Sequence, residues 1–410
     1  EYRKKDCVIL YFIGLTESYE GEGYDRKNLK IPQNQEELLA EIAETVGKDH
    51  IAAISFGGAP MDFSFEKNVG AILHMYLGGQ AVGESVADLI SGEVNPSGKL
   101  AETIPFSEKD TPAWRYFAPP NDDVEYRESI FVGYRYYETF HVPVKYPFGY
   151  GLSYTSFSYS ELNVPEVYSG GKIQIRFKIK NIGKVSGAEI AQLYICPIES
   201  DVIRSHIELK GFQKIYLHPG EEKEVILELD ERSFSVYDVE KKAFSMLSGK
   251  YQICIGASVH DLQLKANMEV VGNSYFRNER ELFPDYFREQ PHGMEISAEQ
   301  FYQLLGGEPK HDKEKKRGEY TVYDSYQDVV NVSMFGKFVR GVVHIGLKII
   351  LRGKSERDPA FKMVKMGVEE GNLEGLIATS GGIATPKLID MLVYNANKKY
   401  LQAFKRLLKK

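Results

Sequence analysis

The fold is decided by an apolar run, CVILYFIGL at Cys7–Leu15, and by the pattern that follows it. A continuous apolar run of this length that ends near glycine is typical of a strand buried on both faces of a parallel sheet. Similar runs recur at 50–60 (HIAAISFGGAP) and 69–79 (VGAILHMYLGG), and they alternate with helical patterns. This alternation predicts a doubly wound α/β sheet over residues 1–158, with functional groups on loops at the carboxyl ends of the strands.

The helical patterns carry their own boundary signals. In NQEELLAEIAETVG (34–47), Asn34 is placed to cap the helix and Gly47 to end it. In QAVGESVADLISGEVNPSG (80–98), we expect Gly92 and Pro96 to stop the second helix. The residues at helical spacing that should pack the first helix on the sheet are Leu38, Leu39, Ile42, Ala43 and Val46.

The sequence texture changes after Tyr150. Short runs in which apolar and polar residues alternate, such as KIQIRFKIKNIG and GKYQICIGAS, are separated by turn signals. This spacing predicts an antiparallel β-sandwich of about seven strands over residues 159–272. A polar and charged segment at 273–328, which includes GGEPKHDKEKKRGE, is predicted to be a linker.

The last region, 329–410, reads as several short helices and is basic by about nine charges. A basic amphipathic helix can lie on a membrane surface, or it can pack against its own neighbours. Packing against neighbours is the more ordinary outcome, and both interpretations stay open.

Composition excludes some classes of function. The formal net charge of −7 and the pI of about 5.8 argue against a nucleic-acid partner, because neutralising phosphates requires an excess of Lys and Arg. Three cysteines at distant positions (Cys7, Cys196 and Cys254) form neither a disulfide framework nor a metal-ligand spacing. Neither a signal peptide nor a membrane span is evident, so we expect a cytoplasmic protein.

The tyrosine-rich segments WRYF (114–117) and YRYYETF (134–140) could stack on sugar rings or fill a domain interface. We favour the interface. The glycine-rich turns GGAPMD (57–62) and GGQAVGES (78–85) lack the spacing of a dinucleotide site. We interpret His74, within AILHMYL, as a core histidine rather than a ligand.

The loop after the first apolar run is the candidate site. ESYEGEGYDRKNLKIP places three carboxylates, Glu17, Glu20 and Glu22, on a glycine-broken loop, followed by Asp25 and Arg26. Flanking glycines give such a loop the freedom to push one carboxyl group into a cleft. From spacing alone, a catalytic carboxyl group and a set of solvated loop carboxylates are both possible.

The order of these motifs resembles the C-terminal half of a glycoside hydrolase family 3 β-glucosidase. Such enzymes have an N-terminal (β/α)8 barrel, then an α/β sandwich domain, then a fibronectin type III-like β-sandwich. The resemblance covers roughly residues 7–270. It rests on GEGYDR (21–26), on YLGGQAVGESVADLISGEVNPSGKLAETIP (76–105), on VEYRESIFVGYRYYE (124–138) and YPFGYGLSYTSFSYS (146–160), and on KNIGKVSGAEIAQLYI, ELKGFQKIYLHPGEEKEV and SGKYQICIGAS in the β-sandwich.

The resemblance implies a role for each residue of the loop motif. Glu22 would be the acid/base of a retaining glycosidase, while Glu20 would be the acid only if the loop were one residue out of register. Tyr24, Asp25 and Arg26 would contact the sugar, and Asp25 with Arg26 could instead form a salt bridge that holds the loop.

The family's nucleophile is an aspartate of the barrel. A barrel needs about 250 residues, which the regions after Tyr150 do not supply. We therefore expect the barrel in cis or in trans, and we expect this chain to be inactive alone. As the alternative to an enzyme module, the chain would be a non-catalytic accessory fragment.

The implied substrates are short β-linked glucosides or aryl β-glucosides, with β-xylosidase or another β-glycosidase activity as the near alternative. No metal or organic cofactor is expected, since two carboxyl groups and water suffice for this reaction.

Overall fold

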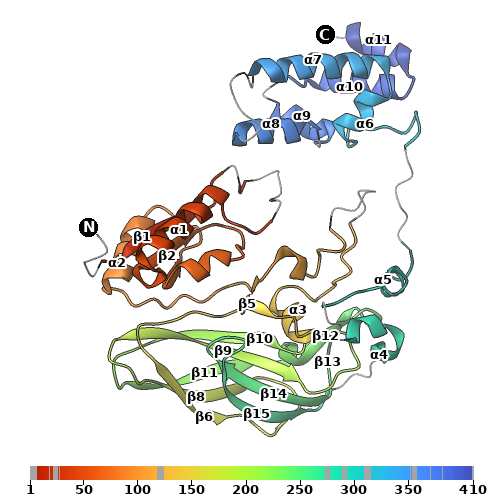
Figure 1. The fold of residues 1–410 in the computed structure, drawn as a ribbon. Helices are drawn as coiled ribbons and strands as arrows, with labels where there is room; N and C mark the ends of the chain where they lie inside the picture. Colours follow the sequence, from red (N-terminus) through yellow and green to blue (C-terminus); the bar gives the residue numbers. More distant parts are fainter. Residues whose placement is uncertain are drawn as a thin grey trace. The chain divides into compact units, whose positions relative to one another are not determined.

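The structure is a computed structural model, and it describes most of the chain (Figure 1). The described residues are 7–17, 19–21, 26, 28–117, 124–272, 278–288, 293–308, 315–350, 352, 358–369, 371–380 and 382–408. The chain divides into two compact units, each described by itself. Unit 1 comprises Glu1–Tyr11, Asn28–Ser55 and Pro60–Pro309; unit 2 comprises Phe12–Lys27, Phe56–Ala59 and Lys310–Lys410.

The predicted α/β region contains a three-stranded sheet in the order β1-β2-β3. The strands are β1 (Ile9–Gly14), β2 (Ile51–Phe56) and β3 (Ala71–His74), and β2 pairs with β3 in parallel. Strand β2 is the most buried. Strand β1 differs from the expectation of burial on both faces, because it lies at an edge of the described sheet and leaves Leu10 41% and Phe12 55% exposed.

Helices α1 (Gln33–Val46) and α2 (Val82–Ser91) occupy the two predicted helical patterns. Gly92 ends α2 with a left-handed φ of 83°, as its position in the sequence predicted. Asn34 does not cap α1, because the helix begins one residue before it, after Pro32. Leu39 is fully buried, whereas Leu38 is 50% exposed and points away from the packed face.

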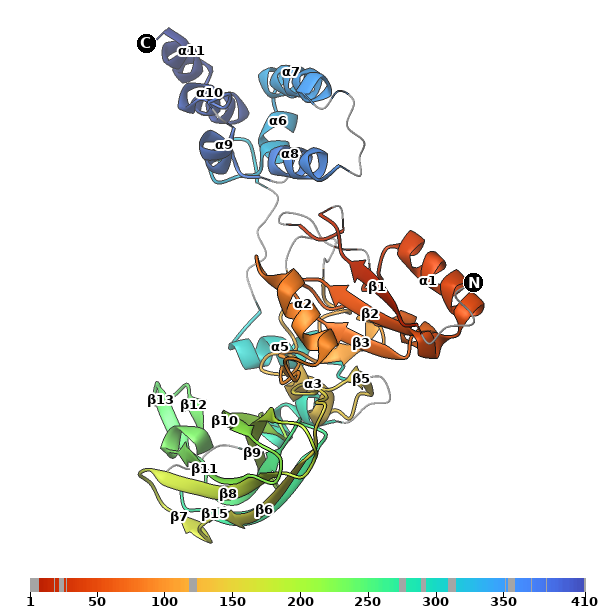
Figure 2. The ribbon, with the colours of Figure 1, turned by 90° about the vertical axis from the view of Figure 1, so that its left-hand side faces the viewer.

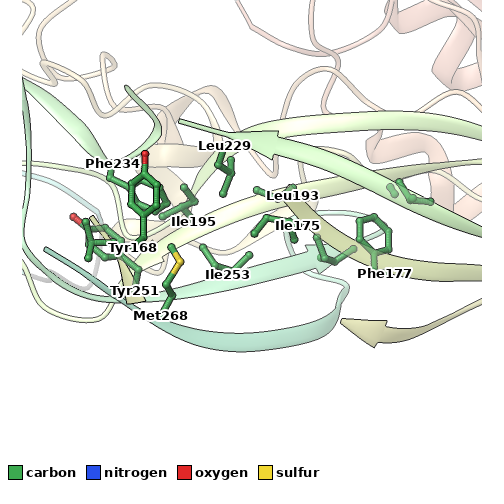
Figure 3. Close-up of a cluster of buried hydrophobic side chains, with 14 of the residues drawn as sticks. Tyr168, Ile175, Phe177, Leu193, Ile195, Leu229, Phe234, Tyr251, Ile253 and Met268 are labelled. Atoms are coloured by element: carbon green, nitrogen blue, oxygen red, sulfur yellow. The ribbon is translucent and has the colours of Figure 1, made fainter. Parts of the chain in front are cut away.

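The β-sandwich is present where the alternating pattern predicted it. One sheet has the order β10-β9-β14-β15-β7 and the other β11-β8-β6, and the apolar residues of both face a common core (Figure 3). Along β8, Ile175, Phe177 and Ile179 are buried at every second position. The strands are β6 (Phe157–Asn163), β7 (Val167–Tyr168), β8 (Ile173–Asn181), β9 (Gly187–Pro197), β10 (Glu208–Leu217), β11 (Glu222–Leu229), β14 (Gly249–Gly256) and β15 (Leu262–Val270), with a hairpin of β12 (Ser235–Asp238) and β13 (Ala243–Met246).

The tyrosine-rich segment YRYYETF forms helix α3 (Tyr134–Thr139), and its three tyrosine side chains are buried. The Tyr134 hydroxyl accepts a hydrogen bond of 2.9 Å from the backbone N–H of Leu209 in β10. The Tyr134 ring lies 6.3 Å from that of Tyr194 in β9. The segment YRYYETF therefore fills an interface with the β-sandwich, as the favoured interpretation predicted, whereas in WRYF the side chains of Trp114 and Phe117 are exposed. The short strands β4 (Ile104–Pro105) and β5 (Val144–Tyr146), which are about 40 residues apart in the chain, form a separate antiparallel pair.

Part of the segment predicted as a linker, 273–328, is folded. Its described residues form α4 (Glu279–Leu282) and α5 (Ala298–Leu305), with a 3₁₀ turn at Pro284–Phe287 between them. The segment folds because it contains apolar side chains that pack on Phe131 and on α3. The linker was predicted from the average composition of the segment, which the charged residues dominate. The buried members are Phe283, Tyr286, Met294, Ile296 and Phe301.

The helical region predicted at 329–410 is present and begins slightly earlier, with a helix that starts at Tyr326. It surrounds its own apolar cluster (Figure 2). The cluster includes Val329, Val330, Leu373 and Leu392, all of which are buried. The described part of the chain contains no helix that is long and apolar enough to cross a membrane. The helices are α6 (Tyr326–Asn331), α7 (Met334–Ile350), α8 (Pro359–Glu369), α9 (Leu373–Thr379), α10 (Pro386–Ala396) and α11 (Tyr400–Leu408).

Candidate active-site loop

The candidate loop leaves the sheet beside a second loop that follows β2. The backbone N–H of Leu15 donates a hydrogen bond of 3.2 Å to the carbonyl of Phe56. The rings of Phe12 and Phe56 stack with their centroids 6.3 Å apart. The two loops therefore start next to each other, at the ends of neighbouring strands.

Glu20 joins the two loops through its carboxylate. Its Oε1 accepts a hydrogen bond of 2.7 Å from the backbone N–H of Gly58, and its Oε2 accepts one of 3.3 Å from that of Ala59. On the Glu20 side, the carbonyl of Thr16 accepts hydrogen bonds from the N–H groups of Tyr19 and Glu20, at 2.7 and 3.0 Å. We call this arrangement, Glu20 with Gly58 and Ala59, the loop clamp.

The loop clamp explains the glycine-rich turn after β2. Two successive backbone N–H groups that point the same way form a small anion-binding site. In GGAPMD that site holds the protein's own carboxylate rather than a phosphate. Sequence reasoning placed both segments but did not pair them, because nothing in either one indicates the other as its partner.

The structure describes only part of the site that the sequence predicted. Arg26 is half-buried within the described residues, whereas Glu22, Tyr24 and Asp25 lie outside them. Further along, the backbone N–H of the buried Asp62 donates a hydrogen bond of 3.0 Å to the carbonyl of Leu29. The Asp62 carboxylate accepts one of 2.9 Å from the N–H of Ser64. Both segments are therefore anchored again beyond the clamp.

His74 is half-buried, and its ring is packed and hydrogen-bonded, as in a structural histidine. Its Nδ1 lies 2.9 Å from the hydroxyl of the fully buried Ser55, and its ring stands edge-on to Phe63 at 5.2 Å. Burial lowers the pKa of His74, and a hydrogen bond with the Ser55 backbone offsets this only in part. The side chain is thus neutral at pH 7. Among the described residues, no group of His, Cys, Asp and Glu side chains is arranged to hold a metal ion.

Comparison with protein families gives two matches in the order of the domains. Residues 1–154 match the glycosyl hydrolase family 3 C-terminal domain, and residues 189–259 match the fibronectin type III-like domain.

Among curated proteins, thermostable β-glucosidase B of Acetivibrio thermocellus is 44% identical over 265 residues, which is 64% of this chain and 35% of that protein. An exo-α-(1→6)-L-arabinopyranosidase of Bifidobacterium breve is 37% identical over 273 residues, covering 67% of this chain and 36% of that protein. The chain thus spans about a third of the length of these relatives.

Among solved structures, the family 3 β-glucosidase of Bifidobacterium adolescentis superposes with a TM-score of 0.63 at 37% identity. The match covers 65% of this chain and 40% of that structure. Kluyveromyces marxianus β-glucosidase gives a TM-score of 0.61 at 35% identity, over 66% of this chain and 33% of that structure.

Proposed function

Because residues 1–154 match the glycosyl hydrolase family 3 C-terminal domain and residues 189–259 match the fibronectin type III-like domain, we propose that this chain is the acid/base-bearing part of a retaining β-glucosidase. Glu22 protonates the departing glycosidic oxygen and then deprotonates the attacking water. A (β/α)8 barrel, in cis or in trans, supplies the nucleophile. Without that carboxylate, the chain does not turn over substrate.

The loop clamp is the observation that supports this assignment within the GEGYDR loop. Both carboxylate oxygens of Glu20 accept hydrogen bonds from the backbone of the loop after β2. A carboxyl group held in this way orients a loop and does not point toward a leaving group. Glu20 is therefore a positioning residue two places before Glu22, and the flanking glycines allow Glu22 to turn into the cleft.

The substrates we propose are short β-linked glucosides and aryl β-glucosides. Two of the relatives differ in the sugar that their names specify, glucose in one and L-arabinopyranose in the other. Both sugars can carry an equatorial glycosidic bond, which one acid/base position can protonate. The choice of sugar then depends on the part of the enzyme that recognises the ring hydroxyl groups.

The test uses this chain in two forms. The first is the purified chain with 4-nitrophenyl β-D-glucoside, for which we expect no turnover above that of Glu22→Gln. The second is a chimera in which residues of this chain replace the aligned 265-residue segment of the Acetivibrio thermocellus relative. We expect this chimera to hydrolyse the substrate.

Variants of the chimera separate the two glutamates. Loss of general acid catalysis should lower turnover of 4-nitrophenyl glucoside by about 10² to 10⁴ in Glu22→Gln. A 2,4-dinitrophenyl glucoside should lose less, because its leaving group needs no proton, and azide should restore turnover of Glu22→Gly with a β-glucosyl azide as product. Full turnover by Glu22→Gln, or azide rescue confined to Glu20→Gly, would overturn the assignment.

A further inference from the structure

Helix α7 has a second apolar face that the core of the helical region does not cover. Val339 is buried in that core, and Phe335 and Val343 pack against it. The other apolar side chains recur at spacings of three and four residues, so they form one stripe along the helix. They are Met334 (90% exposed), Phe338 (68%), Val342 (54%), Ile345 (61%) and Ile349 (68%).

Helix α11 presents a similar stripe. It lies against α10, where Arg406 binds Asp390 at 2.8 Å, and only Ala403 of the helix is buried. Both views show α7 and α11 along the same upper edge of the helical region (Figures 1 and 2). The exposed apolar residues of α11 are Tyr400 (56%), Leu401 (74%), Phe404 (61%), Leu407 (50%) and Leu408 (68%).

Charge decides which occupant fits these two stripes. Residues 329–410 contain 15 Lys and Arg against 6 Asp and Glu, a formal net charge of +9, within a chain whose net charge is −7. Helices α7 and α11 themselves contain no acidic residue. On α7, the exposed Lys337 and Lys348 border the stripe, and on α11 the exposed Lys405 does the same.

A second copy of the chain fits this surface poorly. Pairing two stripes would bring their lysine borders together, and like charges in contact repel each other. An anionic bilayer surface matches both features, because its headgroups attract the lysines and its acyl boundary accepts the exposed apolar side chains.

We propose that the α7 and α11 stripes bind the surface of an anionic membrane, with both helices lying in the interface plane. Neither helix crosses the bilayer. The proposal does not depend on the glycosidase assignment, since it concerns only the helical region.

The first experiment is co-sedimentation of the full chain with vesicles that contain about one third phosphatidylglycerol in phosphatidylcholine. We expect binding to these vesicles, no binding to pure phosphatidylcholine, and weaker binding as salt rises. The double variants Phe338→Asp/Ile345→Asp and Leu401→Asp/Phe404→Asp should each weaken binding by roughly tenfold or more.

The matched control is Phe212→Asp/Val239→Asp. These two side chains are 67% and 66% exposed, but they belong to the β-sandwich region. The control carries the same change of charge and should bind like the wild type. An unchanged thermal unfolding midpoint in all three double variants shows that any loss of binding is not a loss of fold.

A fluorescence probe separates apolar insertion from attraction by charge alone. Trp114 is the single tryptophan, so Trp114→Phe/Phe338→Trp places the only indole on the α7 stripe. We expect its emission to shift to shorter wavelength with anionic vesicles and to be quenched by brominated acyl chains. Trp114→Phe/Phe212→Trp should show neither effect.

Three results would overturn the proposal. The first is equal vesicle binding by the stripe variants and the wild type. The second is binding without a shift of the Phe338→Trp emission. The third is a dimer in sedimentation velocity that dissociates in the stripe variants, together with no binding to vesicles. That result would show that the stripes bind a second copy of the chain.

Discussion

The carboxylate of Glu20 and the backbone N–H of Gly58 are 38 residues apart in the chain and 2.7 Å apart in the structure. This hydrogen bond, with the one from Ala59, is charge-assisted, because an ionised oxygen accepts from a backbone donor. It links the loop that carries the GEGYDR motif to the loop after β2. The position of the motif therefore depends on a residue outside it.

Replacing Glu20 by Gln should weaken the loop clamp. The amide of Gln has one oxygen that can accept a hydrogen bond, and its NH₂ group is a donor that cannot bind the second backbone N–H. The expected loss is about 1 to 3 kcal/mol of local opening free energy. Amide hydrogen exchange at Gly58 and Ala59 should accelerate, while exchange in β2 stays unchanged. Glu44→Gln, an exposed change on α1, is the control. Unchanged exchange at Gly58 would contradict the role given to Glu20.

The buried carboxylate of Glu189 should make the stability of unit 1 depend on Lys99. The Lys99 ammonium lies 3.0 Å from the Glu189 carboxylate, and the two side chains are only 11% and 7% exposed. Burial raises the pKa of Glu189, and Lys99 opposes this shift. Removing the ammonium in Lys99→Met should cost about 3 kcal/mol of unfolding free energy, because the carboxylate stays buried without its cation.

Chemical denaturation measures this effect, and two variants control it. Lys99→Met/Glu189→Gln should recover most of the lost stability, since no buried charge is left unpaired. Lys172→Met should change stability little, because the Lys172–Glu228 pair is exposed, with side chains 73% and 49% accessible. Equal losses in Lys99→Met and Lys172→Met would contradict a special role for the buried pair.

Acid should destabilise the β-sandwich through Glu208. Burial raises the pKa of this carboxyl group, but Arg204 at 2.8 Å and Lys210 at 2.5 Å outweigh burial, so its pKa lies below the ordinary value of 4.5. The ion pairs then contribute stability above that value, and the contribution disappears as pH falls through the lower folded pKa. Unfolding midpoints measured between about pH 5 and pH 3 should fall more steeply for the wild type than for Glu208→Gln. Parallel curves would show that another group controls the acid response.

Two of the three cysteines should resist alkylation. Sγ of Cys196 on β9 lies 3.7 Å from Sγ of Cys254 on β14, and Cys254 is fully buried. The hydrogen bond with Cys254, together with burial, raises the pKa of Cys196, so its reactive thiolate is scarce at pH 7. Iodoacetamide should modify the half-buried Cys7 at least about tenfold faster than either, as mass spectrometry of the peptides will show. Rapid modification of Cys254 in the folded chain would contradict the packing described.

Local patterns predicted the elements whose causes are local. The alternation in KIQIRFKIKNIG predicted β8, because a period of two is enough to place Ile175, Phe177 and Ile179 on one face. Gly92 ended α2 because a left-handed residue is needed there. Asn34 did not cap α1, since Pro32 already allows the helix to begin earlier.

Signals averaged over a long segment were less informative. The charge run at 308–319 concealed the apolar residues around it, so Phe283 and Phe301 were assigned to a linker although both pack on α3. The three cysteines were distant in sequence, and only the pairing of β9 with β14 brought two of them together.

The sequence by itself determined the order of the domains, the periodic burial of their strands and helices, and the motif that carries Glu22, because each of these depends on residues close together in the chain. The tertiary structure decided that Glu20 binds Gly58 and Ala59, that Lys99 pairs with Glu189, and that the apolar stripe of α7 is left uncovered. Hydrogen bonds and burial between distant segments depend on how the fold places those segments next to each other, and no local sequence pattern specifies that placement.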